Sequence, residues 1–153
     1  MTQTDLAGTT RGVRLMYLIL LGAAVLVAIA FMVMVQLRGP ILVRDSGTEV
    51  IAWSFSGIGV TAVAFGVLLV RPRIPPRAPE ESIDGYWGGT SVARARSMLL
   101  WIIAENAGMV SALGYLLTGH LAPLAALALA LAVLAWFNPS RIASSESTRR
   151  ETR

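Results

Sequence analysis

The sequence predicts an all-α fold: an integral membrane bundle of four transmembrane helices with both termini in the cytoplasm. Hydrophobic residues make up 55% of the 153 residues, more than a soluble domain of this size carries. They are concentrated in four apolar segments, and arginine residues flank these segments with a strong bias to one side. The length fits a single domain.

The four apolar segments are residues 15–37, 50–70, 98–118 and 121–137. Each must be helical, because the bilayer core offers no water to satisfy exposed backbone groups. The first contains one strongly polar residue, Gln36, and reaches about 34 Å, which spans a bilayer with some tilt. The fourth segment is shorter and carries no polar side chain.

A cleaved signal peptide is the alternative interpretation of the first segment. Arg11 and Arg14 precede the apolar run, and residues 28–30 read Ala-Ile-Ala, the pattern of a cleavage site. The run stays apolar through residues 31–35, whereas the apolar region of a signal peptide spans about 7–15 residues. We therefore expect a transmembrane helix here.

Arginine placement predicts the orientation. All thirteen basic residues are arginine, and only Arg38 and Arg44 lie in the expected external loop. The others lie on the opposite side of the segments: Arg11, Arg14, Arg71, Arg73, Arg77, Arg94, Arg96, Arg141, Arg149, Arg150 and Arg153. The positive-inside rule then places both termini in the cytoplasm, and we expect the chain in the inner membrane of a bacterium.

Three soluble segments are expected on the cytoplasmic side: residues 1–14, the loop 71–97 and the tail 138–153. Four prolines favour extended geometry in the first half of the loop. Residues 144–153 of the tail are poor in apolar side chains, so we expect the tail to be disordered.

At the end of the loop, Thr90 or Ser91 can cap a helix that runs into the third span. Arg94 and Arg96 then lie at the level of the lipid phosphates, which we expect them to contact.

Five aromatic residues fall near the ends of the segments. Trp53 and Tyr115 lie near the outer boundary, and Tyr17, Trp101 and Trp136 lie near the inner one. Amphipathic rings favour headgroup depth, so these residues are expected to anchor the bundle at the two membrane surfaces.

Glu105 is the main candidate functional residue, because it lies inside the third segment. A carboxylate there costs a few kcal/mol or more unless it is protonated, paired or facing water. One interpretation is a neutral carboxyl, joined by Asn106, that hydrogen-bonds a neighbouring helix. A second is a proton or cation site coupled to transport, and a third is a contact with another subunit or a lipid headgroup. Thr61 lies at a similar depth and is the expected hydrogen-bond donor.

Small residues recur every fourth position on the same helix. Ala104, Gly108 and Ala112 form a ladder of the kind that lets two transmembrane backbones approach closely. We therefore expect the face that carries them to be packed against another helix.

Composition and motifs argue against enzyme chemistry. There is no cysteine, which excludes disulfides and thiolate metal sites, and no nucleotide-binding or hydrolase motif is present. Asp45 and Glu49 could meet His120 and form a weak metal site, but an exposed turn histidine is the expected role. We expect no cofactor, no metal and no nucleic acid partner.

Part of the chain resembles a loosely defined group of small, uncharacterised bacterial four-span membrane proteins. The matching features are Arg94 and Arg96, the mid-helix Glu105, the Leu-Thr-Gly turn at 117–119 and Pro139, over about a third of the chain. The last two helices also look faintly like a rotary-ATPase proteolipid hairpin, although the first span lacks the glycine repeat of that family. Small multidrug-resistance transporters are similar in span number and in having one membrane glutamate, which they place in the first helix.

These observations favour a non-enzymatic structural or accessory membrane component that packs through small-residue helix faces. The alternative is a proton-coupled transporter or channel component that uses Glu105. The expected partners are the lipid bilayer and either further copies of the chain or a larger membrane complex.

Overall fold

The computed structural model describes residues 3–42, 45–78, 80–88 and 91–144, and the regular structure within these ranges is entirely helical. The elements are α1 (Gln3–Arg38), α2 (Ser46–Phe65), a π-helix (Gly66–Val70), a 3-10 helix (Arg71–Arg73), α3 (Ile83–Trp87), α4 (Val92–Thr118), α5 (Leu121–Trp136) and α6 (Pro139–Ser144). The predicted all-α class is confirmed for this part of the chain.

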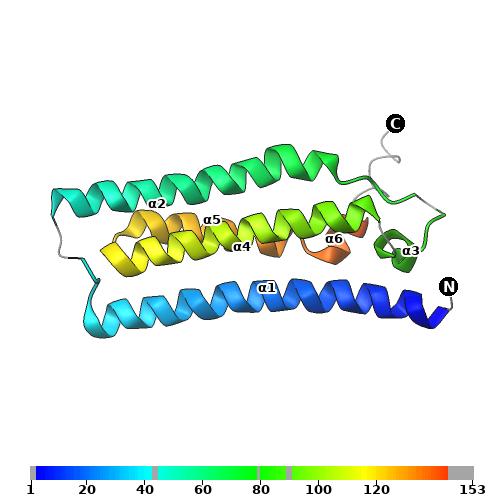
Figure 1. Ribbon diagram of the computed structural model, residues 1–153, viewed down its shortest axis with the longest axis horizontal. Helices are drawn as coiled ribbons and strands as arrows, with labels where there is room; N and C mark the ends of the chain where they lie inside the picture. The colour runs from blue at the N-terminus through cyan, green and yellow to red at the C-terminus, as the bar shows by residue number, and fades with distance from the viewer. Residues whose placement is uncertain (1–2, 43–44, 79, 89–90, 145–153) are drawn as a thin grey trace.

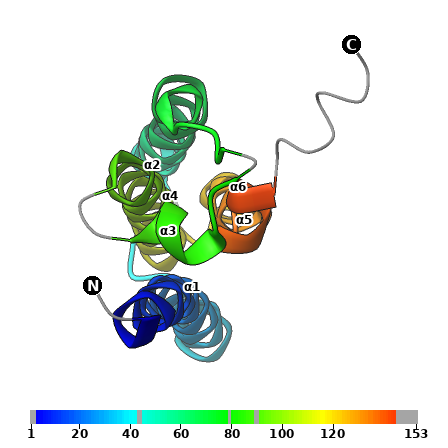
Figure 2. The ribbon, with the colours of Figure 1, turned by 90° about the vertical axis from the view of Figure 1, so that its right-hand side faces the viewer.

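Helix α4 lies at the centre of the bundle and packs against α1, α2 and α5. Helices α1 and α2 flank it on opposite sides, and the short helices α3 and α6 lie over one end (Figures 1 and 2). We call this end the arginine end, because it holds Arg14, Arg71, Arg73, Arg96 and Arg141. The other end, with the turn between α4 and α5, is called the histidine end after His120.

Three of these helices are long and apolar enough to cross a membrane by length and composition. The first is α1, which contains the predicted segment 15–37. The second is α2 together with the two short helices that continue it, and it contains segment 50–70. The third is α4, which contains segment 98–118. Helix α5 matches the fourth segment and is apolar but only 16 residues long.

Helix α4 begins earlier than its apolar segment. The hydroxyl of Ser91 accepts a hydrogen bond of 3.1 Å from the backbone N–H of Arg94, as an N-cap residue does. Ser91 thus caps the helix as the sequence suggests, while Thr90 lies outside the described residues. The helix therefore includes residues 92–97 at the end of the expected loop, as a cap at Ser91 predicts.

The chain after α5 differs from the expected disorder. Residues Pro139–Ser144 form α6, in which Pro139, Ile142 and Ala143 are buried. Their spacing gives the short helix one apolar face, which packs onto the arginine end. The prediction of disorder for 145–153 lies outside the described residues.

Hydropathy and burial run in opposite directions among the three long helices. In the most apolar stretch of each, mean hydropathy is 3.0 in α1, 1.9 in α2 and 1.4 in α4. The buried share of the same stretches rises from 11% through 28% to 56%. The most apolar helix is thus the most exposed, which is the reverse of what water imposes on a soluble core.

Close contacts between α2 and α4 depend on glycine. A Cβ atom at Gly59 would lie 2.3 Å from Ser111 Oγ, and one at Gly114 would lie 2.6 Å from the Cβ atom of Phe55. A side chain at Gly114 does not fit without displacement of the neighbouring helix, whereas one at Gly59 requires the Ser111 hydroxyl to rotate away. The small residues here let the two backbones approach closely.

An aromatic cluster ties α1, α3 and α4 together at the arginine end. The ring centroids of Tyr17 and Trp101 lie 5.3 Å apart, and those of Trp87 and Trp101 lie 6.2 Å apart. Tyr17 Oη donates to the carbonyl of Leu134 and Trp101 Nε1 donates to the carbonyl of Phe137, at 3.0 and 2.7 Å. Both acceptors lie at the C-terminus of α5, where carbonyls lack an intrahelical partner.

Three of the five expected membrane anchors are therefore buried inside the bundle: Tyr17, Trp101 and Tyr115. Tyr17 and Trp101 use their polar atoms to cap α5, so these atoms do not reach lipid headgroups. Trp53 and Trp136 are exposed, as an interfacial role requires.

Candidate functional site

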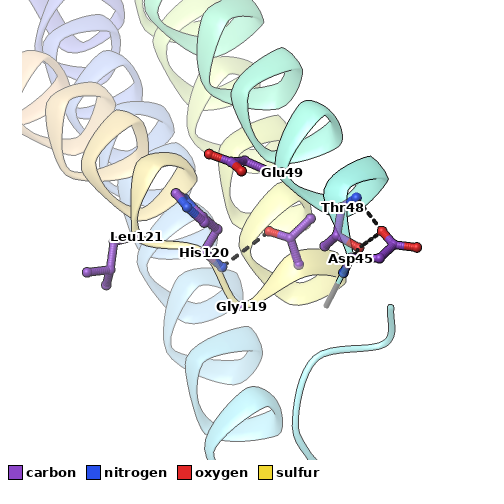
Figure 3. A pocket seen from close by; sticks show the side chains of 7 residues that line it. Asp45, Thr48, Glu49, Gly119, His120 and Leu121 are labelled. Atoms are coloured by element: carbon purple, nitrogen blue, oxygen red, sulfur yellow. Dashed lines mark hydrogen bonds between the residues drawn. The ribbon is translucent and has the colours of Figure 1, made fainter. Parts of the chain in front are cut away.

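A cavity of about 420 Å³ opens at the histidine end (Figure 3). It lies between the start of α2 and the turn that joins α4 to α5. Its lining residues are Asp45, Thr48, Glu49, Thr118, Gly119, His120 and Leu121. The fold thus brings together the three titratable residues that the sequence offers as a weak metal site.

The turn that presents His120 is held by its own residues. Gly119 ends α4 with a φ of +63°, a left-handed conformation that glycine adopts without steric cost. Thr118 Oγ1 accepts a hydrogen bond from the backbone N–H of His120. The Nδ1 atom of His120 in turn accepts from the backbone N–H of Ala122 and caps α5. One ring nitrogen of the histidine is therefore committed to the fold.

Asp45 is also committed to the fold. It forms a capping box with Thr48, whose backbone N–H donates to the Asp45 carboxylate at 2.8 Å. This hydrogen bond, followed by one from the Thr48 hydroxyl, holds the pKa of Asp45 below its usual value. Among the described residues, no group of three or more His, Cys, Asp or Glu side chains is placed to hold a metal ion. Sharing a cavity therefore does not make Asp45, Glu49 and His120 a metal centre.

Glu105 lies on the face of α4 that packs against α1. Trp101, one turn earlier, contacts Tyr17 of α1, and Ala112, two turns later, clusters with Ala28 of α1. The Glu105 side chain is half-buried at this interface. Within the described part of the chain, its carboxyl makes no hydrogen bond and no ion pair.

The two expected partners of Glu105 do not join it. Thr61 is exposed on α2, and no hydrogen bond connects it with Glu105. Asn106 is exposed as well, and its side-chain amide donates to the carbonyl of Ile102 in its own helix at 2.8 Å. Thr61 and Asn106 therefore belong to the outer surface of the bundle.

The ladder of small residues on α4 faces the inside of the bundle. Ala104, Gly108 and Ala112 are buried. A Cβ atom at Gly108 would lie 3.6 Å from Leu127 and 3.7 Å from Ala130, both on α5. The ladder is thus used for packing within the chain and leaves partner contacts to other surfaces.

A different small-residue surface remains open on α2. A groove of about 710 Å³, which we call the α2 groove, runs along this helix beside Ile103 of α4. Its lining residues are Ser54, Gly57, Ile58, Thr61, Ala62, Phe65 and Ile103. Ile103 is the lining residue that α4 contributes.

The two arginines expected at lipid phosphates lie at the arginine end. The guanidinium of Arg96 donates to the backbone carbonyl of Arg73, which fixes it against the 3-10 helix. Arg94 is half-buried, and its backbone N–H takes part in the Ser91 cap. Contact of Arg94 and Arg96 with lipid stays a prediction.

Comparisons with known proteins found no matching family model, no matching curated protein and no matching solved structure. The site must therefore be interpreted from its own geometry.

Two features of this geometry have no clear sequence signal. The sequence predicts Tyr17 and Trp101 as interfacial anchors, whereas in the structure their polar atoms cap α5. The exposure of Asn106 depends on which side of α4 the other helices occupy. Both features depend on contacts between helices that are far apart in the sequence, and the local sequence pattern carries no information about such contacts.

Proposed function

We propose that this chain is a non-enzymatic structural or accessory protein of the bacterial inner membrane, with four spans and both termini in the cytoplasm. Insertion is supported by the opposite trends of hydropathy and burial, because lipid is the solvent that favours large apolar side chains on the outside. Leu18, Leu26 and Ile29 of α1 are among these exposed side chains. Orientation is supported by the arginines at one end of the bundle.

Helix α5 is the fourth span in this proposal. Its 16 residues reach about 24 Å, less than the roughly 30 Å hydrocarbon core. A short span is accommodated by local thinning of the bilayer or by its flanking residues, at a modest cost. The exposed Trp136 at its end fits an interfacial position.

The α2 groove is the observation that carries the accessory role. Elsewhere the spans expose many large apolar side chains, which lipid solvates well. The groove instead presents Gly57 and Thr61. Small and polar residues of this kind mark the contact faces of transmembrane helices, because they allow close packing and interhelical hydrogen bonds. We therefore assign the groove to a transmembrane helix of a partner subunit.

Site-specific photocrosslinking in native membranes tests this assignment. A photoreactive residue at Thr61 should give a protein adduct of one defined mass, and the same residue at Leu26 on α1 should label only lipid. Gly57→Leu should abolish the adduct, because Gly57 has open space around it in the isolated chain and the larger side chain would fill the groove. Gly22→Leu, at an equally open position on α1, is the matched control.

Membrane insertion is measured in the same samples by extraction with alkaline carbonate. Wild-type chain in the extract would disprove insertion and the proposed function with it. Retained protein that crosslinks equally at Thr61 and Leu26, or whose adduct survives Gly57→Leu, would disprove the role of the groove.

Glu105 supports a second candidate function, a proton-coupled transporter or channel component. The supporting observation is that this half-buried carboxyl has no hydrogen bond or ion pair within the described chain, although it lies in the middle of a span. A carboxyl in this setting is free to gain and lose a proton or to receive a ligand.

The nearly isosteric change Glu105→Gln separates the two candidates. Under the accessory role, the variant should form the Thr61 adduct as the wild type does. Under the transport role, proton or solute flux in reconstituted vesicles should collapse. Flux that is absent from both proteins would reject transport. A carbodiimide, which reacts with protonated carboxyls in apolar surroundings, should label Glu105 less as the pH rises if the group titrates.

A further inference from the structure

A second cavity, of about 280 Å³, lies at the arginine end. Four parts of the chain enclose it: α1, the segment after the 3-10 helix, α3 and α6. Figure 2 shows α3 and α6 next to each other over this end of the bundle. The lining residues are Arg14, Arg77, Ile83, Trp87, Pro139, Ser140, Ala143 and Ser144.

The two arginines of this cavity differ from others at the same end. Arg71 and Arg141 lie over the rings of Phe137 and Trp136, at 5.7 and 4.4 Å from the ring centroids. The side chains of Arg73 and Arg96 donate to backbone carbonyls.

Arg14 and Arg77, in contrast, make no hydrogen bond, ion pair or ring contact with any described residue. No acidic residue is among the described residues that line the cavity. The carboxyl of Asp84, next to the lining residue Ile83, accepts a hydrogen bond from Thr10. The cavity therefore presents two uncompensated guanidinium groups.

The chemistry of the walls identifies the ligand class. Guanidinium groups bind phosphate through paired hydrogen bonds, and Ser140 adds a hydroxyl donor. Ile83, Trp87, Pro139 and Ala143 form an apolar wall, which suits the glycerol and upper acyl part of a lipid better than a soluble anion. The volume lies just below the usual range for ligand pockets, so it fits a headgroup rather than a whole lipid.

The position along α1 agrees with a lipid headgroup. Arg14 immediately precedes the apolar stretch that begins at Leu15, so its guanidinium lies where lipid phosphates lie if α1 spans the membrane. We propose that this cavity binds the phosphodiester headgroup of an anionic phospholipid. The inference rests on the proposed membrane insertion.

Titration of the delipidated full chain in a neutral detergent tests the site, with native mass spectrometry as the measurement. The probes are short-chain phosphatidylglycerol, short-chain phosphatidylcholine and soluble glycerol phosphate. The wild type should bind phosphatidylglycerol saturably and roughly tenfold more tightly than either other probe. The double variant Arg14→Gln with Arg77→Gln should lose this preference.

The matched control is Arg11→Gln with Arg73→Gln, which removes the same charge from the same end without touching the cavity. It should keep the preference. An equal loss in both double variants would show that surface charge alone attracts the lipid and would overturn the inference. Equally tight binding of glycerol phosphate would overturn the assignment to lipid.

Two further measurements keep the outcomes distinguishable. Circular dichroism and tryptophan fluorescence show whether each variant is folded, and the single variants Arg14→Gln and Arg77→Gln replace the double variant if it is not. Each single change should then weaken phosphatidylglycerol binding, and unchanged binding in both would refute the site. Carbonate extraction of the wild type tests insertion separately, so retained protein without lipid preference would disprove this site alone.

Discussion

Helices α1 and α4 are both long enough to span a bilayer, yet they use apolar residues in opposite ways. In α1 the most apolar stretch is 11% buried, and leucine and isoleucine side chains project away from the bundle. In α4 the corresponding stretch is 56% buried and is rich in alanine, glycine and serine. Large apolar side chains thus cover the outer surface of α1, whereas α4 supplies small residues to a closely packed interior.

The difference also indicates where each helix obtains its stability. Lipid tails are as apolar as leucine, so under the proposed insertion an exposed side chain on α1 gains little from contact with another helix. A buried side chain on α4 gains from dispersion contacts and complementary shape, which lipid does not reproduce. Matched substitutions on the two helices should therefore have very different effects.

Truncation of one leucine on each helix should show the largest contrast. Leu100 on α4 is 1% exposed and Leu26 on α1 is 69% exposed. Leu100→Ala leaves a cavity in the core cluster and should lower the free energy of unfolding by about 2 kcal/mol or more. Leu26→Ala should change it by only a few tenths of a kcal/mol. Unfolding by sodium dodecyl sulfate in mixed micelles measures both, and equal losses would contradict the assignment of faces.

Addition of a methyl group should give the next largest contrast. Gly114→Ala places a Cβ atom 2.6 Å from the Cβ atom of Phe55, which cannot rotate away. The strain should cost about 1–3 kcal/mol. Gly22→Ala on α1 meets no atom within 4 Å and should be neutral or slightly stabilising. Tolerance of Gly114→Ala in the same unfolding assay would show that α2 and α4 are not held at this distance.

The long helices can be predicted from the sequence because apolar runs and N-cap residues are local patterns. Apolar runs define α1, α2 and α4, and Ser91 supplies a local N-cap signal that the structure uses. The inner face of each helix cannot be predicted in the same way. In the first and fourth segments, nearly all side chains are apolar, so periodicity does not separate lipid-facing from protein-facing positions.

The candidate site shows the same limit. Glu105 is identified by its chemistry alone, since a carboxyl within a span is unusual in any fold. Its surroundings depend on the rotation of α2 and of α4 about their own axes, which leaves Thr61 and Asn106 on outer surfaces. Depth along the membrane can be counted from the sequence, but rotation about the helix axis cannot.

Removal of the Tyr17 hydroxyl tests the contact between α1 and the C-terminus of α5. Tyr17→Phe deletes the donor to the Leu134 carbonyl and should cost about 1 kcal/mol. Tyr115→Phe on α4 is the control, because the Tyr115 hydroxyl makes no hydrogen bond with the described residues. The two variants should differ in midpoint while unfolding with the same cooperativity. A smaller loss for Tyr17→Phe than for Tyr115→Phe would argue against capping of α5 by α1.

The smallest effect should come from Ser97, a buried residue on α4. Burial usually makes a residue costly to change, and Ser97 is expected to be an exception. Ser97 is fully buried, and its hydroxyl has no hydrogen-bond partner among the described residues. Ser97→Ala removes an unsatisfied polar atom, so it should leave stability unchanged or raise it by up to about 1 kcal/mol. Ser111→Ala is the matched variant, because the Ser111 hydroxyl is equally buried but donates to the Ala107 carbonyl at 2.8 Å. It should therefore lose a few tenths of a kcal/mol or more.

A clear loss of stability in Ser97→Ala, measured beside Ser111→Ala, would show that the hydroxyl has a partner in the membrane, such as a water or a lipid oxygen. The contrast between α1 and α4 would then extend from packing to polar contacts, since only the buried helix would have a position that depends on such a partner.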